Sequence, residues 1–166
     1  MKHLYLISGP MGVGKTATAK ALNKLLPASV MLDGDWLWMA DPFVVTEETK
    51  RMVMGNIHHV LNAFLACSAY EHVIFGWVMN KPEIAKDVLE GLSLHNVAVH
   101  KITLTAEEET LIDRVQKDIE MGKRMPGSVE KSLAYLRTFE KGDFDVIRTD
   151  GKTPEDIAKA IAQRAL

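Results

Sequence analysis

The chain has 166 residues, of which 47% are hydrophobic and 25% charged, and its formal net charge is −2 at pH 7. This length and composition fit one globular domain spanning 1–166, and the near-neutral charge argues against a nucleic-acid partner. A single cysteine, Cys67, excludes an internal disulfide and favours a reducing, cytoplasmic setting. No window approaches the roughly 18 apolar residues of a membrane-spanning helix, so we expect no membrane partner.

The most specific motif of the chain is a glycine-rich loop of the form G-x-x-x-x-G-K-[ST]. The motif consists of Gly9, Pro10, Met11, Gly12, Val13, Gly14, Lys15 and Thr16, and Ala17 follows it. Residues 3–8 before it are predicted to form a buried strand and residues 17–26 a helix, which is the context of a phosphate-binding loop (P-loop). A glycine-rich turn that binds nothing is the alternative, and the flanking strand and helix disfavour it.

The chemistry of the loop explains its residue types. Glycines let the backbone approach a ligand closely, and successive N–H groups at a helix N-terminus attract anions. Lys15 is expected to reach the β- and γ-phosphates of ATP, and the Thr16 hydroxyl is expected to bind Mg²⁺. We therefore predict that the loop and Ala17 hold the nucleotide.

Two carboxylates follow the second predicted strand, 29–32. Asp33 and Asp35 flank a glycine there, and in an open α/β sheet ligands lie at the carboxyl ends of strands. Beside a phosphate-binding loop, one of the two is predicted to hold Mg²⁺ through water, and the other to accept the proton of an attacking hydroxyl. An Asp-Gly turn with a helix cap explains the same residues without any chemistry.

The next segment supplies candidates for an acceptor site. Trp36 and Trp38 follow the aspartates, and each is expected either to wall an apolar pocket or to pack in the core, with Trp36 the better candidate for the wall. A helix is predicted to begin after a Thr46 cap and to run to about residue 69. Arg51 lies near its start, where it either contacts an anionic or hydroxylated substrate or is simply solvated.

A third strand is predicted at 72–79, wholly apolar as a central parallel strand should be. Phosphate-loop ATPases often carry an acidic residue at the end of such a strand. Gly76 and Trp77 stand there instead, which argues against a hydrolysing motor and leaves Asp33 as the expected partner of the metal. Trp77 is predicted to stack on, or wall, the acceptor.

The second half of the chain continues the alternation. Helices are predicted at 82–92, after Thr105, from Ser128 and from 154, with strands at 97–104 and 144–149. A basic stretch with glycine and proline, 116–128, is predicted to form a mobile lid. Its positively charged side chains Arg124 and Lys123 would neutralise the charge of the transferring phosphoryl group. A solvated basic loop is the alternative. The turn at 150–153 is expected near the adenine, although a plain turn explains it equally well.

Five strands alternating with helices after a phosphate loop describe a doubly wound α/β domain. The chain resembles the small P-loop kinases, the group of shikimate, adenylylsulfate and gluconate kinases and chloramphenicol phosphotransferase, most specifically in the loop and in Leu32-Asp33-Gly34-Asp35. The resemblance implies a three-layer α/β/α fold with a five-stranded parallel sheet in the order 2-3-1-4-5.

The resemblance also implies roles for single residues. Asp33 would lie near Mg²⁺, Asp35 would contact the acceptor hydroxyl, Arg114 or Arg124 would belong to the lid, and the turn containing Gly151 would border the adenine. The sequence differs from that of shikimate kinases after Gly76 and from that of adenylylsulfate kinases after Asp35. The resemblance therefore covers the architecture of the group and does not indicate one particular substrate.

The resulting hypothesis is an ATP- and Mg²⁺-dependent kinase that phosphorylates a small hydroxylated molecule and works as a monomer or homodimer. Its catalytic residues would be Lys15, Asp35, Arg114 and Arg124, and Asp35, Trp36, Arg51, Gly76 and Trp77 would meet the acceptor. A nucleoside monophosphate kinase is one alternative, since tryptophans stack on bases. A P-loop module that binds ATP with little or no transfer is the other.

Overall fold

The structure, a computed structural model, describes residues 1–165 and contains one parallel five-stranded sheet. The strands are β1 (Lys2–Ser8), β2 (Ser29–Asp33), β3 (His72–Gly76), β4 (Val97–Thr105) and β5 (Asp145–Arg148). They lie in the order β2-β3-β1-β4-β5, and every adjacent pair is parallel. This is the strand order implied by the resemblance to small P-loop kinases, so the predicted fold class is confirmed.

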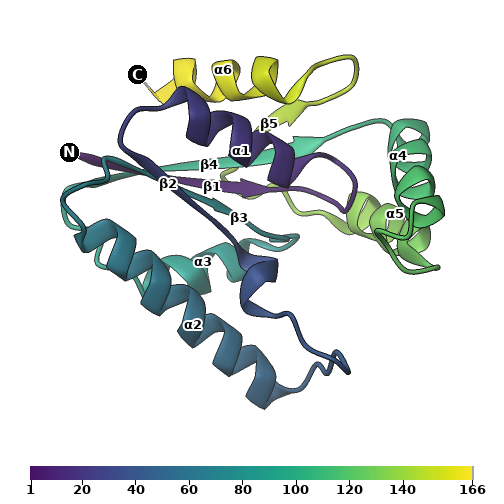
Figure 1. The fold of residues 1–166 in the computed structure, drawn as a ribbon, viewed down its shortest axis with the longest axis horizontal. Coiled ribbons are helices and arrows are strands. Elements are labelled where there is room, and N and C mark those ends of the chain that lie inside the picture. Colours follow the sequence, from purple (N-terminus) through teal and green to yellow (C-terminus); the bar gives the residue numbers. More distant parts are fainter. Residues whose placement is uncertain (166) are drawn as a thin grey trace.

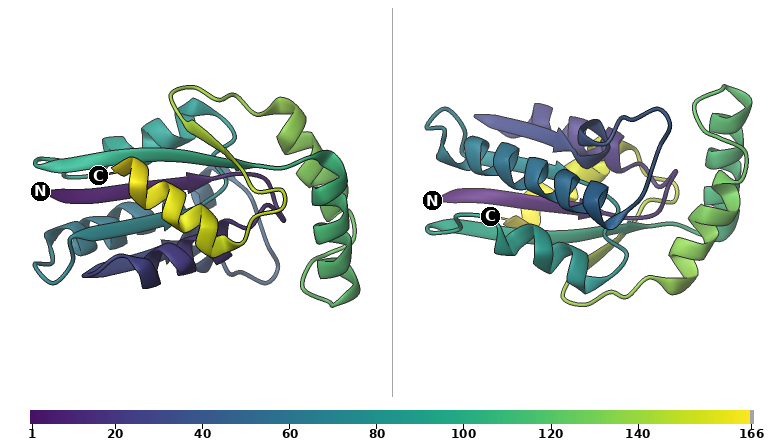
Figure 2. Two further views of the ribbon diagram at one scale, coloured as in Figure 1. Left: turned by 90° about the horizontal axis from the view of Figure 1, so that it is seen from above. Right: turned by 90° about the horizontal axis from the view of Figure 1, so that it is seen from below.

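Helices cover both faces of the sheet. They are α1 (Lys15–Leu25), α2 (Glu47–Ala66), α3 (Pro82–Glu90), α4 (Glu108–Glu120), α5 (Ser128–Thr138) and α6 (Pro154–Ala165), with a 3₁₀ helix η1 (Gly34–Leu37) after β2. Helices α1 and α6 lie on one face, and α2 and α3 lie on the other (Figure 1). Helices α4 and α5 stand beyond the carboxyl ends of the strands in both views of Figure 2. No helix within residues 1–165 is long and apolar enough to cross a bilayer.

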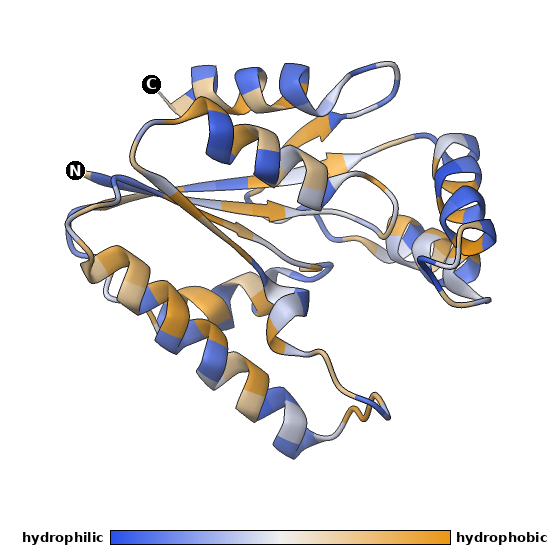
Figure 3. Ribbon diagram, viewed as in Figure 1, coloured by the Kyte–Doolittle hydropathy of each residue, from blue (hydrophilic) through white to orange (hydrophobic). Residues whose placement is uncertain are grey.

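The central strand β1 is buried on both sides, as parallel strands between two helical layers must be. Tyr5 and Ile7 belong to the core that includes residues of α1 and α6, whereas Leu4 and Leu6 belong to the core that includes residues of α2 and α3. The apolar colouring of the carboxyl halves of the inner strands is visible in Figure 3. This alternation fixes which face of β1 each helical layer covers.

The strand register brings three carboxyl ends to one level. Ile7 of β1 and Asp33 of β2 are both paired with Gly76, the last residue of β3. The P-loop, the Asp33 carboxylate and the segment after β3 therefore start from the same edge of the sheet, where ligands bind in open α/β folds.

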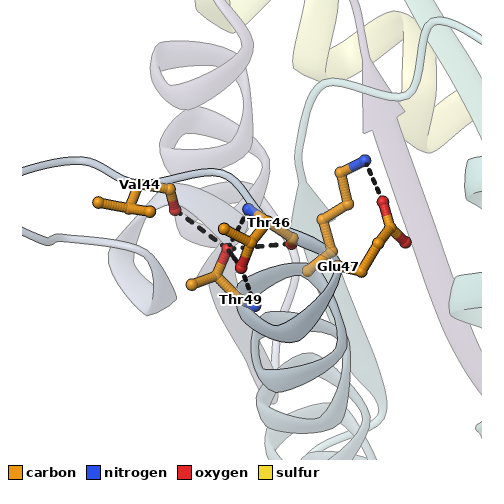
Figure 4. Close-up of polar contacts among 5 residues, drawn as sticks. Val44, Thr46, Glu47 and Thr49 are labelled. Carbon is orange, nitrogen blue, oxygen red and sulfur yellow. Dashed lines mark hydrogen bonds and ion pairs between the residues drawn. The ribbon is translucent and has the colours of Figure 1, made fainter.

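A capping box fixes the start of α2, and the predicted Thr46 cap is confirmed (Figure 4). The Thr49 amide donates to Thr46 Oγ1 at 3.1 Å, and the Thr46 amide donates to Thr49 Oγ1 at 2.9 Å. Thr49 Oγ1 also donates to the Val44 carbonyl at 3.0 Å. These bonds satisfy donors that a helix N-terminus leaves free, and they fasten the preceding loop to α2.

Several predicted boundaries were wrong. Strand β3 ends at Gly76 rather than at residue 79, since its pairing with β1 and with β2 stops at this residue. Of the predicted lid, 116–120 belongs to α4, and only 121–127 connects α4 to α5, since the first residue that interrupts the helix is Gly122, with φ +71°. Helix α4 begins after Glu107 rather than at a Thr105 cap, and Gly127, not Ser128, precedes α5 as its N-cap.

Three histidines meet near the amino ends of the inner strands. His3 Nδ1 and His100 Nε2 lie 3.0 Å apart, and the His3 and His72 ring centroids are 5.1 Å apart. Tyr5 Oη lies 3.2 Å from His72 Nδ1. Burial lowers the pKa of His72 and of His100, and repulsion from His3 lowers the pKa of each further. His72 and His100 therefore resist protonation in the folded state.

We predict that the free energy of unfolding falls as the pH drops from about 7 to about 5. The unfolded chain titrates its histidines near pH 6.5, above the folded pKa of His72 and His100, so below that pH it binds more protons than the folded state. Urea denaturation at several pH values measures the slope. The His100→Gln variant, which removes one titrating ring, should show a smaller slope over this range, and an identical slope would contradict the prediction.

Candidate functional site

The P-loop packs so closely against β4 and α4 that two of its positions require glycine. A Cβ on Gly9 would lie 2.7 Å from the Leu104 carbonyl oxygen, and one on Gly12 would lie 2.5 Å from Val115 Cγ2. Both residues have positive φ, +147° and +83°. The loop therefore presents backbone N–H groups at the start of α1, as a phosphate cradle does.

Lys15 folds back over this loop. Its Nζ donates to the carbonyl oxygens of Gly9 and Pro10 at 2.7 and 2.9 Å. Burial lowers its pKa to about 8, an effect that the carboxylates of Asp35 and Asp33 partly oppose. A desolvated ammonium group gains more than a solvated one from a bound anion, so the site is prepared for negative charge.

A chain of hydrogen bonds links the loop to the end of β2. Thr16 Oγ1 donates to Asp33 Oδ2 at 2.6 Å, and the Asp35 amide donates to Asp33 Oδ1 at 3.0 Å. Asp33 is buried. Both of its carboxylate oxygens are thus engaged, and one of them orients the Thr16 hydroxyl.

The side-chain oxygens of Thr16 and Asp33 fit the binding of Mg²⁺ together with a bound phosphate. Within residues 1–165, no cluster of three His, Cys, Asp or Glu side chains is placed to hold a metal. Mg²⁺ at such sites takes one or two protein oxygens and completes its shell with phosphate oxygens and water. Thr16 and Asp33 provide this kind of partial site.

Asp35 lies beside this pair with a perturbed carboxyl group. Burial raises its pKa, and the Asp33 carboxylate raises it further. Lys15 and Arg124 oppose the shift through their charges, and the Trp77 side chain opposes it through a hydrogen bond. A carboxylate whose pKa is raised is a stronger base, which suits a group that accepts a proton.

These side chains surround one cavity of about 700 Å³ at the carboxyl edge of the sheet. Among its lining residues are Lys15, Thr16, Ala17, Asp33, Asp35, Lys123 and Arg124, with Met11, Gly12 and Gly14 of the loop. Arg124 comes from the connection between α4 and α5, where its Nε donates to Asp118 Oδ2 at 2.9 Å. Asp118 also lines the cavity, a role that its place within a predicted lid did not signal.

Arg114 occupies a different place from Arg124. Its Nη1 donates to Thr149 Oγ1 at 3.0 Å and to the Val13 carbonyl at 3.3 Å. It lines a separate cavity of about 250 Å³ on the other side of the P-loop. The turn that contains Gly151 borders this cavity through Thr149 and Lys152. The geometry favours a nucleotide-contacting position for Arg114, and its catalytic role stays a prediction.

The predicted acceptor residues do not share one cavity. Asp35 lines the cavity of about 700 Å³, and the other four do not. Arg51 and Trp77 line a third cavity, of about 850 Å³, together with Trp38. Trp36 is 48% exposed and lines neither this cavity nor the one around Asp35. Gly76 is buried at the end of β3 and lines neither cavity.

The sequence favoured Trp36 over Trp38 as a pocket wall, and the structure reverses this order. Both are tryptophans just past the aspartates, and the turn of η1 decides which of the two lines the cavity. Val78 lines both the 700 and the 850 Å³ cavities, and nothing in its local sequence indicated this.

Comparison with known proteins places the chain in a family. A family model described as an AAA domain, AAA_18, matches residues 6–134. The chain belongs to the AAA_18 family. No curated protein matches the sequence.

Solved structures similar to this AAA_18 chain are small kinases and related proteins. The tunicamycin resistance protein of Deinococcus radiodurans superposes with a TM-score of 0.70 at 23% identity, covering 99% of this chain and 96% of that one. A gluconokinase from Sinorhizobium meliloti gives 0.66 at 19%, covering 98% and 93%. The shikimate kinase of Acinetobacter baumannii, in complex with shikimate, gives 0.62 at 20%, covering 99% and 93%. At these identities the likeness establishes the P-loop kinase fold.

We predict that the AAA_18 chain binds ATP more weakly as the pH rises above about 8. Lys15 of the free protein loses its proton there, whereas bound phosphates hold the proton on, so affinity should fall up to about tenfold per pH unit. The last phosphate proton of ATP leaves near pH 6, so the ligand's own charge is constant in this range.

Calorimetric titration with ATP between about pH 7 and pH 9.5 measures this effect. The Lys15→Arg variant keeps its charge throughout and is the matched control. A wild-type dissociation constant that stays constant across the range would contradict the prediction.

Proposed function

We propose that the chain is an ATP- and Mg²⁺-dependent kinase that transfers the γ-phosphoryl group to a hydroxyl of a small molecule. One observation carries this proposal: Lys15, the Thr16–Asp33 pair, Asp35 and Arg124 surround a single cavity next to the P-loop. A phosphate cradle, a partial magnesium site, a base and a second cation are the parts that phosphoryl transfer needs.

Each residue has a defined task in this mechanism. The loop amides and Lys15 bind the β- and γ-phosphates, and Asp35 accepts the proton of the acceptor hydroxyl as its oxygen attacks the γ-phosphorus. Arg124 neutralises charge on the transferring group. Mg²⁺ bound at Thr16 and Asp33 would supply further neutralisation of phosphate charge.

A nucleoside monophosphate kinase is the second candidate, favoured by the tryptophans beside Asp35. Trp38 and Trp77 line the neighbouring cavity, where a base would stack, and Arg51 lies there for an acceptor phosphate. A binding module without transfer has less support, because simple ATP binding does not need a buried, perturbed carboxylate beside the P-loop.

The direct experiment is a coupled ADP-release assay with ATP and Mg²⁺ and a panel of candidate acceptors. The panel should hold nucleosides, nucleoside monophosphates, sugars, hydroxy acids and antibiotics. ADP release that depends on an added alcohol supports the proposed function, and release that depends only on monophosphates favours the second candidate. A flat panel with tight ATP binding would move the assignment to the binding module.

We predict that Asp35→Asn lowers kcat by about 10²–10³, because the amide cannot accept the hydroxyl proton, and that Lys15→Ala loses transfer by a similar factor. Steady-state kinetics on the acceptor found in the panel measure both. Asp113→Asn is the matched control, since Asp113 is exposed on α4 and lines neither cavity. Thermal unfolding checks that the variants fold, and near-normal turnover by Asp35→Asn would remove Asp35 from the mechanism.

The Trp77 hydrogen bond gives a second kinetic prediction. It lowers the pKa of Asp35, so Trp77→Phe should raise that pKa and move the acidic limb of the kcat profile to higher pH. Well above the new limb, kcat should return towards the wild-type value. A profile that is lowered at every pH without a shift would indicate a packing role for Trp77 alone.

A further inference from the structure

The cavity of about 850 Å³ between α2 and α3 differs in character from the phosphate cavity. Its lining includes the apolar side chains Trp38, Val45, Met54, Trp77, Val78 and Ile84. Cavities with apolar and aromatic walls and few polar groups bind molecules with apolar bodies. The volume exceeds the 700 Å³ of the phosphate cavity, so the cavity has room for more than a short polyol chain.

Trp77 lines the apolar cavity and packs against the residue between the two aspartates of the phosphate cavity. Its indole lies directly against Gly34, where a Cβ would come within 2.5 Å of Trp77 Cδ1 and Cγ. The same side chain lies close enough to Asp35 to lower the pKa of that carboxyl. A ring that rests on Trp77 would therefore lie next to the carboxylate that takes the acceptor proton. Gly34 is what allows the indole this position.

Most charged groups at this cavity are already engaged. Glu47 pairs with Lys50 at 3.0 Å, and Glu90 pairs with Lys86, outside the cavity, at 3.5 Å. His58 Nε2 lies 2.9 Å from the Asp87 carbonyl oxygen.

Two charged lining residues remain, Arg51 and Asp87, which have no ion-pair partner among residues 1–165. Arg51 and Asp87 are therefore the charged lining residues left to bind hydroxyls, and a polyol with hydroxyls on every carbon would find too few such partners to replace all its hydrogen bonds to water.

The apolar surface continues to the rim of the cavity. Phe43 lies against Trp38, with ring centroids 5.1 Å apart, and is 61% exposed. Val44 and Val45, which follow it, are also exposed. The loop that the capping box fastens to α2 thus offers apolar side chains at the mouth and the wall of the same cavity.

Building on the proposed function, we propose that the phosphoryl acceptor is an aromatic alcohol whose flat ring lies against Trp77 and whose hydroxyl reaches Asp35. The hydroxyl oxygen forms a bond to the γ-phosphorus of ATP while the bond to the β-phosphate bridging oxygen breaks. Asp35 takes the hydroxyl proton. The products are ADP and a phosphate monoester of the aromatic alcohol.

Matched ligand pairs test the ring preference without requiring turnover. Phenyl glucoside and methyl glucoside share their hydroxyls and differ in the ring, as do phenylethylene glycol and ethylene glycol. We expect the aromatic member of each pair to bind the full chain, in the presence of ADP and Mg²⁺, about tenfold more tightly in calorimetric titrations. Equal affinities within both pairs would overturn the proposal.

Variants show whether the ring binds at the proposed place. Trp77→Ala should reduce the preference to within about twofold, and Trp77→Phe, which keeps an aromatic wall, should retain it. Trp77→Leu keeps apolar volume without a ring and replaces the alanine variant if that one does not fold. Met39→Ala is the control for non-specific apolar contact, since Met39 is 84% exposed and outside the cavity. A full preference in Trp77→Ala or Trp77→Leu would overturn the assignment.

ADP release with the same compounds separates this inference from the proposed function. Transfer to the aliphatic members without any ring preference would keep the kinase and overturn the aromatic acceptor. Ring-selective binding with no ADP release from any compound of the wider panel would overturn the kinase, and with it the acceptor, and leave an aromatic-binding site on the protein.

Discussion

The hydrogen bond between Thr16 and Asp33, 2.6 Å long, is the contact on which the arrangement of the site depends. It joins the first turn of α1, the helix that follows β1, to the last residue of β2. Strands β1 and β2 are not neighbours in the sheet, because β3 lies between them. The bond therefore requires the three strands to end at one level. Their register provides this, since Gly76 pairs with both Ile7 and Asp33. The same register brings Trp77, the next residue after β3, beside Asp35.

A second set of contacts ties the helices beyond the sheet to the P-loop. Ser132 Oγ donates to the Met11 carbonyl at 2.6 Å, and Tyr135 Oη lies 3.0 Å from Ser8 Oγ. The Met79 amide donates to that same Ser8 hydroxyl at 2.9 Å. Helix α5 is thus fixed to the loop that it adjoins. The basic residues Lys123 and Arg124 stand on the short connection before it, so the cations that line the phosphate cavity lie on 121–127 rather than on a long flap.

The sequence was enough to predict the features that depend on local chemistry. The P-loop follows from its glycine spacing, and the positions of Asp33 and Asp35 follow from a buried strand ending in acids. Features that depend on packing between distant segments were not predictable in the same way. Trp36 and Trp38 differ by two positions, and only the geometry of η1 separates the exposed one from the cavity wall. The need for glycine at Gly34 comes from the Trp77 indole, which lies more than forty residues further along the chain.

The two cavities differ in how far a shared fold determines their walls. The phosphate cavity is lined by the P-loop, by the acids at the end of β2 and by residues of α4 and the connection after it, and the fold that holds them is shared with structures at 23% identity or below. The 850 Å³ cavity takes its walls from the end of η1, from α2, from the segment after β3 and from α3, and no motif constrains them together. Under the proposed function, substitutions in these walls would change which acceptor binds and leave the Thr16–Asp33 contact in place, because neither of those two residues lines this cavity. In this chain the walls combine two tryptophans and aliphatic side chains with charged groups that are mostly paired, and this composition, rather than any similarity of fold, is the physical argument for the kind of molecule that Asp35 would meet.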